Sequence, residues 1–165
     1  MATTYQIDPA HSLAKFSVKH MMIAKVYGAF KNISGNFYYD SDKIDQSKVE
    51  VNIDASSIDT SDTQRDSHLK SVDFLNVEKF PTLTFKSSRF ERSRDKLLVT
   101  GDLTIHGVTK QVTLQVAGPG KEIKSLTGKT KIRRKDFGLA WHGIMEAAGM
   151  LVGDEISITF EVAVQ

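Results

Sequence analysis

Residues 97–116 read LLVTGDLTIHGVTKQVTLQV, and this stretch decides the fold class. Apolar and polar side chains alternate on both sides of His106-Gly107, as they do in half-buried antiparallel strands. A two-residue turn at His106-Gly107 pairs Ile105 with Val108. The stretch therefore predicts a β-hairpin with one apolar face.

The register of this hairpin follows from its turn. Counting outward from the turn sets Val99 opposite Leu114, with both side chains inside, and Thr100 opposite Thr113 outside. Each face is then uniform in character, so the sequence specifies the pairing strongly.

The same alternation recurs along the chain, in roughly eight to ten runs without a linker or repeat between them. A sheet with so many strands usually closes into a barrel or splits into a sandwich. We therefore expect an all-β fold in a single domain over residues 1–165. The most regular of the other runs are residues 14–20, 49–55 and 156–164.

A polar segment, residues 56–71, interrupts the strands. Ser61 followed by Gln64 has capping-box spacing, which predicts a short helix over residues 63–72. A second helical turn is expected over residues 144–148, ended by Gly149.

On the first helix, Arg65, His68, Leu69 and Val72 would share one face. We expect Leu69 and Val72 to turn inward, which would carry the guanidinium and the imidazole toward the interior. A charged group turns inward only when it is paired or lines a cavity. Arg65 therefore either pairs with a carboxylate such as Asp66 and fixes the helix, or contacts a ligand.

Composition excludes several classes of protein. The chain has 165 residues, 22 basic and 20 acidic side chains and no cysteine, which excludes disulfide scaffolds and cysteine-ligated metal centres. Residues 1–8 contain neither a basic segment nor an apolar run, and no later stretch approaches the roughly 18 apolar residues of a membrane-spanning helix. We therefore expect a cytoplasmic protein without stable membrane insertion, whereas a chain that had lost a leader would be periplasmic.

Lys129, Lys131, Arg133 and Lys135 fall on one face of a predicted strand. Such a face either stays solvated and protects a sheet edge from aggregation or binds an anionic partner. It lacks the aromatic side chains typical of single-strand binding, so we expect no nucleic-acid partner. An interaction module that uses this face is one alternative function.

The sequence contains no close-spaced motif for catalysis or metal binding. It lacks an H-E-x-x-H pair, a G-x-S-x-G nucleophile elbow and a glycine-rich phosphate loop. We therefore expect no enzyme activity, no metal and no cofactor. The other alternative, an enzyme acting on a hydrophobic substrate, would need a polar cluster with perturbed pKa values inside the barrel.

His20 lies on the same face of its strand as the apolar residues Phe16 and Val18. It is either a core residue whose hydrogen bonds are satisfied or a residue that contacts a ligand.

Several short stretches, in this order and at this spacing, form a specific set: YQID (5–8) followed by HS (11–12), FSVKH (16–20), GAF (28–30), RDSHL (65–69), DFLNV (73–77), FP (80–81), GDLTIHGVT (101–109) and KDFG (135–138). Together they resemble the YceI-like family of lipocalin-like polyisoprenoid-binding proteins, over a match that runs from about Tyr5 to Gln165. Where that family has a second aromatic residue after Asp73-Phe74, this chain has Leu75.

The resemblance implies an extended eight-stranded antiparallel barrel with one or two short helices. It implies binding, transport or storage of a long-chain isoprenoid or fatty amphiphile in the barrel lumen, without catalysis. The sequence does not fix the oligomeric state, and a homodimer is one assembly that it allows.

Such a carrier needs an apolar lumen with polar groups at its mouth. Strand parity directs Phe16, Val18 and Leu103 into the lumen. The other expected lumen residues are aromatic: Phe37, Phe74, Phe85, Phe137 and Trp141. The expected polar rim consists of His20, Arg65, His68, Asp73 and Asp136.

Overall fold

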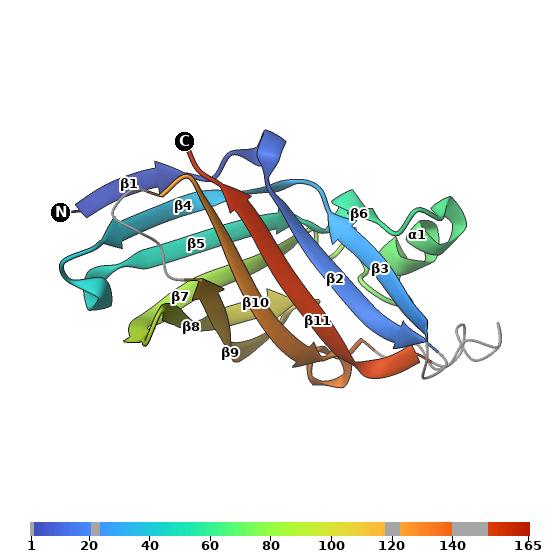
Figure 1. Cartoon of the computed structure of the whole chain (residues 1–165). Helices are drawn as coiled ribbons and strands as arrows, with labels where there is room; N and C mark the ends of the chain where they lie inside the picture. Colours follow the sequence, from blue (N-terminus) through green and yellow to red (C-terminus); the bar gives the residue numbers. More distant parts are fainter. Residues whose placement is uncertain (1, 21–23, 118–122, 140–151) are drawn as a thin grey trace.

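The computed structural model of the protein describes residues 2–20, 24–117, 123–139 and 152–165. Antiparallel strands make up most of this part of the chain (Figure 1). The strands are β1 (Ala2–Gln6), β2 (Leu13–His20), β3 (Ala24–Phe30), β4 (Ile33–Asp40), β5 (Lys48–Asp54), β6 (Ile58–Asp59), β7 (Thr82–Ser93), β8 (Lys96–Ile105), β9 (Val108–Ala117), β10 (Ser125–Arg133) and β11 (Val152–Ala163). The helix is α1 (Thr63–Lys70), and short 3-10 turns are η1 (Pro9–His11), η2 (Ile44–Gln46), η3 (Ala55–Ser57) and η4 (Arg134–Phe137).

The eleven strands of the described residues form one sheet, and six of them are halves of longer, bent strands. β1 and β2 are separated by η1, β3 and β4 by Lys31-Asn32, and β5 and β6 by η3. Each half pairs with the matching half of the neighbouring bent strand: β1 with β4, β2 with β3, β4 with β5, and β3 with β6. The eleven pieces therefore follow the course of eight antiparallel strands, in agreement with the expected fold class.

The first and last strands meet and close the sheet. β11 pairs with β2, and Ile7, just after β1, forms a bridge with Val164. Gln6 and Gln165 exchange two backbone hydrogen bonds of 3.1 and 2.9 Å. In Figure 1, β2, β10 and β11 run at an angle to β4 and β5, and α1 lies beside β3 and β6 at one end. The result is a barrel with an inside and an outside.

The predicted register of the β8–β9 hairpin is confirmed, although Thr100, predicted to lie outside, is buried. Val99 pairs with Leu114 and Thr100 with Thr113, and Val99 and Leu114 are both buried. The hydroxyl oxygens of Thr100 and Thr113 lie 3.0 Å apart. His106 has φ 56° and the following glycine φ 73°, as a type I′ turn requires.

The predicted helix forms, but its cap is not Ser61. α1 runs from Thr63 to Lys70, and the side chain of Asp62 accepts hydrogen bonds from the backbone amides of Gln64 and Arg65. Ser61 has φ 64°, so its backbone turns the chain into the helix. The capping-box prediction was wrong by one residue, because aspartate is an equally good N-cap.

The prediction that Val72 turns inward was also wrong, since Val72 is 75% exposed. The chain leaves the helical path after Lys70, and the amide of Leu75 donates to the carbonyl of Leu69 at 2.9 Å. Phe74 and Leu75 are buried instead. Because α1 ends two residues before Val72, helical periodicity does not determine which way this side chain points.

None of the helices in the described residues is long and apolar enough to cross a bilayer. The second helical turn predicted over residues 144–148 lies outside the described part of the chain.

Gly101 permits a close approach between β7 and β8. A Cβ atom at this position would lie 2.4 Å from the carbonyl oxygen of Lys86 and 2.7 Å from Cζ of Phe85. At Gly128 on β10, a Cβ atom would lie no closer than 3.4 Å to Val116, which is an ordinary contact.

We predict that Gly101→Ala lowers the free energy of unfolding by about 1–3 kcal/mol, because the added methyl group forces the backbone to shift. The control, Gly128→Ala, should change it by less than about 1 kcal/mol. Denaturant unfolding of both variants measures the difference. Equal losses in the two variants would contradict the close approach at Gly101.

Candidate ligand-binding lumen

The inner face of the barrel is apolar because the strands alternate in register. On β8, Leu97, Val99, Gly101, Leu103 and Ile105 are all buried. The residues between them belong to the outer face, where Asp102 is exposed. Parity alone therefore supplies a continuous row of inward groups along the strand.

Two apolar cavities lie inside the barrel. The cavity that we call the terminal cavity, of about 60 Å³, is lined by Ile7 and Val164 near the ends of the chain. The second, the helix cavity, of about 80 Å³, is lined by Leu69 of α1. Along β8, Leu97 and Val99 line the first and Leu103 and Ile105 line the second, so the cavities follow one another along the barrel.

The walls of both cavities carry almost no polar chemistry. Among the described residues, Lys15 is the only titratable one that lines either of them. Its ammonium group pairs with Glu161 at 2.8 Å, and both side chains are substantially exposed, so the charge lies outside. The described residues also contain no group of three His, Cys, Asp or Glu side chains that could hold a metal ion.

The shifted pKa values belong to ion pairs on the surface. The hydrogen bond and ion pair with Asp59, at 2.6 Å, raise the pKa of Lys31, and the same pair lowers the pKa of Asp59. Neither residue lines an apolar cavity. The electrostatics of the described residues therefore give no sign of an acid–base site in the lumen.

Most of the predicted lumen residues lie on the cavity walls. Phe137 is buried but lines neither apolar cavity, and Trp141 lies outside the described residues. Contact of these side chains with a ligand stays a prediction. Phe37 and Phe85 line the terminal cavity, and Phe16, Val18, Phe74 and Leu103 line the helix cavity.

A third, polar cavity of about 200 Å³ lies where β9 and β10 diverge. In the described part of the chain, β9 pairs with β10 only at Gln115 and Val116. Lys110 pairs with Leu103 across the hairpin and so has an inward register, yet it is exposed and lines this gap together with Asp136. Lys110 was not among the predicted site residues, because the divergence of two strands leaves no trace in the sequence.

The residues of the predicted polar rim lie on several elements, and their contact with a ligand stays a prediction. His68 and Asp73 are exposed and line neither apolar cavity, and Asp136 is exposed at the third cavity. Leu69 is the only buried residue of α1. The other residues of the helix are exposed or partly buried, and the side chain of Arg65 lies against the segment that joins β6 to α1. His20 ends β2, and its side chain lies outside the described part of the structure.

Arg65 has a structural role. Its Nε donates to the hydroxyl of Thr60 at 2.8 Å and its Nη2 to the carbonyl of Thr60 at 2.7 Å. The amide and hydroxyl of Thr60 in turn donate to the carboxylate of Asp66. The guanidinium therefore fastens α1 to the segment after β6, with Thr60 as its partner where a carboxylate was predicted.

Three aromatic wall residues were missed, and one of them is Phe30, at the end of β3, which lines the helix cavity. Phe160 lies within the alternating run 156–164 and lines both apolar cavities, so its parity could have identified it. Phe90 lines the terminal cavity although it is an odd number of residues from Phe85, which does so too. An irregularity in the β7–β8 pairing between Ser87 and Arg89 reverses the parity, and nothing in the sequence marks its position.

A family model described as YceI-like domain matches residues 5–164. The chain belongs to this family. The relative "Protein YceI" of Escherichia coli O6:H1 is 39% identical over 148 residues, which cover 84% of this chain and 78% of the relative.

Solved structures show the same fold. BcnA of Burkholderia cenocepacia has a TM-score of 0.84 and 29% identity, covering 96% of this chain and 99% of that one. A polyisoprenoid binding domain from Saccharophagus degradans has a TM-score of 0.73, covers 98% of this chain and 97% of that chain, and is 14% identical. The second likeness concerns the fold alone.

The basic face of this YceI-like domain is partly neutralised by β11. Nζ of Lys131 lies 3.7 Å from Oε1 of Glu155, and Nε of Arg133 lies 3.0 Å from Oδ2 of Asp154. Exposed pairs of this kind contribute little to stability. The pairing favours a solvated outer face over an anion-binding surface.

We predict that Arg65→Ala lowers the free energy of unfolding by about 1–2 kcal/mol, because two hydrogen bonds from a charged donor are lost at a half-buried site. His68→Ala, three residues along the same helix and exposed, should change it by less than about 0.5 kcal/mol. Thermal or denaturant unfolding compares the two variants. An Arg65→Ala variant as stable as the wild type would contradict the structural role.

Proposed function

We propose that this YceI-like domain binds a long-chain amphiphilic lipid in its lumen, with a polyisoprenoid as the first candidate, and carries or stores it chemically unchanged. The observation that carries the proposal is the succession of two apolar cavities along the inside of the barrel. The structural neighbour from Saccharophagus degradans, described as a polyisoprenoid binding domain, and membership of the YceI-like family support the same ligand class.

The energetics require a long chain. Burial of one methylene-sized group contributes about 0.8 kcal/mol, so an isoprene unit of five carbons contributes about 4 kcal/mol. Association itself costs on the order of 4–15 kcal/mol. A chain of roughly one to four isoprene units is therefore the shortest that an apolar lumen can hold without help from the head group.

The lumen must widen to take such a chain. Cavities of about 60 and 80 Å³ are smaller than the roughly 300–1,000 Å³ of typical ligand sites. Side chains rather than strands have room to move, because backbone pairing fixes the wall. We expect the aromatic side chains of the wall to change rotamer when the ligand enters.

Binding fits the lumen better than catalysis does. A reaction would need a positioned acid, base or nucleophile near the buried chain. The described walls offer only the stem of Lys15, whose charge is paired outside. A carrier needs no such group.

We predict that Leu103→Glu folds with reduced stability and loses bound lipid. Leu103 is 2% exposed and lines the helix cavity, so a carboxylate there would lie in an apolar site, at a cost of several kcal/mol unless water enters. Thr104→Glu, the next residue on the outer face, is the matched control and should retain lipid. Circular dichroism checks folding, and mass spectrometry of extracted lipids measures retention.

The direct test uses the wild-type protein. Native extraction should yield a long-chain lipid, and isoprenoid alcohols or fatty amphiphiles should raise the melting temperature, because a ligand that binds only the folded state stabilises it. Protein that carries no lipid and gains no thermal stability from either class would overturn the proposed function.

A further inference from the structure

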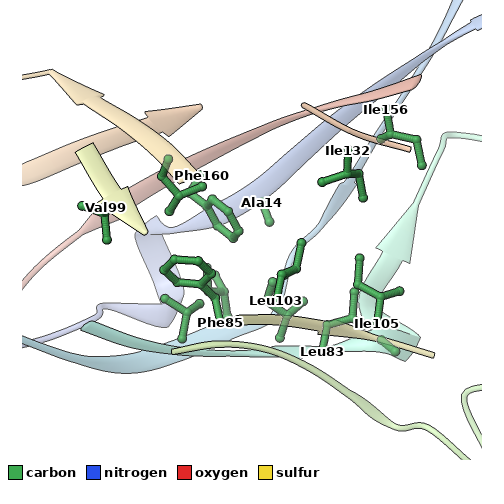
Figure 2. Close-up of a cluster of buried hydrophobic side chains, with 14 of the residues drawn as sticks. Ala14, Leu83, Phe85, Val99, Leu103, Ile105, Ile132, Ile156 and Phe160 are labelled. Atoms are coloured by element: carbon green, nitrogen blue, oxygen red, sulfur yellow. The ribbon is translucent and has the colours of Figure 1, made fainter. Parts of the chain in front are cut away.

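We infer that Phe160, with Phe85 opposite it, forms a waist across the lumen that selects bound lipids by chain length. This inference rests on the proposed function and adds a specificity determinant to it. Among the described residues, Phe160 alone lines both apolar cavities. Figure 2 shows the rings of Phe85 and Phe160 directed toward one another, with Val99 on one side of them and Leu103 on the other.

The order of residues along β8 places the waist at mid-barrel. Leu97 and Val99 line the terminal cavity, Leu103 and Ile105 line the helix cavity, and Gly101 lies between the two pairs. From Leu97 to Ile105 the strand covers about 27 Å, which is about 20 Å along the barrel axis at a tilt of roughly 40°. Each cavity therefore occupies about half of that length.

β11 gives the same order independently. Ile156 and Ile158 line the helix cavity, and Val162 and Val164 line the terminal cavity. Phe160 is the inward residue between them. Two strands with different neighbours thus mark the division at the same level.

The two rings are held differently. Phe85 is fully buried, and its ring covers Gly101, where even a methyl group would lie 2.7 Å from it. Phe160 pairs with Gly128 on one side and with Ala14 on the other. Glycine has no side chain and alanine only a methyl group, so these neighbours leave the ring of Phe160 room to turn. Phe85 is therefore the fixed half of the waist, and Phe160 is the movable half.

Selectivity for the chain length of the lipid follows from this arrangement. A chain short enough for one cavity binds with the waist closed. A longer chain must displace the ring of Phe160 from its packed position before it reaches the second cavity. The waist therefore penalises long chains relative to short ones, and a smaller side chain at position 160 removes the penalty.

The test measures dissociation constants for geraniol, a short isoprenoid alcohol, and geranylgeraniol, which has twice the carbon atoms. We expect Phe160→Ala to lower the ratio of the long-chain to the short-chain dissociation constant by about tenfold, and Phe160→Leu to lower it less. Thr159→Ala, on the neighbouring residue of opposite parity, should leave the ratio unchanged.

A variant with the opposite effect sharpens the test. Gly128 lines the terminal cavity and has room for a Cβ atom, so Gly128→Leu should fill that cavity. We expect this variant to weaken binding of geranylgeraniol by about tenfold and to leave geraniol bound in the helix cavity.

The outcomes separate the two proposals. If the wild type binds both alcohols and neither Phe160 variant changes the ratio, the waist is overturned and the proposed function stands. If the wild type binds neither alcohol, the proposed function fails, and the waist with it. Should Phe160→Ala not fold, Phe160→Leu decides the matter, because it keeps the interior apolar and still shortens the side chain at the waist.

Discussion

The pairing of β11 with the first bent strand, which consists of β1 and β2, is the contact on which the rest of the structure depends. It joins β11 to β2 and, through Ile7 and Val164, to the end of β1. An open antiparallel sheet needs another layer of structure to cover its apolar face, whereas a sheet that closes into a barrel covers its inner face by itself. Because the sheet is closed, the inward residues of every strand face the same interior. Their side chains pack against one another there and form the wall of the lumen.

Bending is what lets so few strands close around so long a space. Three strands are interrupted by short turns or irregular residues and then continue in a new direction. Each half keeps its own partner, so the sheet changes direction without losing its backbone hydrogen bonds. The divergence of β9 and β10 is the place among the described residues where this continuity is weakest, and a polar cavity forms there.

The lumen is defined by shape more than by chemistry. Its described walls offer neither a metal site nor an acid–base pair, and the polar contacts that do form, such as Arg65 with Thr60, stabilise the scaffold. In such a site, discrimination between ligands has to come from volume and length. A single aromatic side chain that reaches both cavities, Phe160, is then a natural place for that discrimination to arise.

The sequence by itself determined the all-β class, the register of the β8–β9 hairpin and the inward parity of Phe16, Val18 and Leu103. It could do so because alternation has a period of two and the turn at His106-Gly107 fixes its phase. Short motifs in the right order also indicated the family. Only the tertiary structure decided what interrupts that periodicity. The irregular pairing between Ser87 and Arg89 brings Phe90 inward, the early end of α1 exposes Val72, and the gap beside β10 exposes Lys110. Parity and helical period are local properties of the chain, whereas bulges, helix ends and gaps between strands are set by what packs against them.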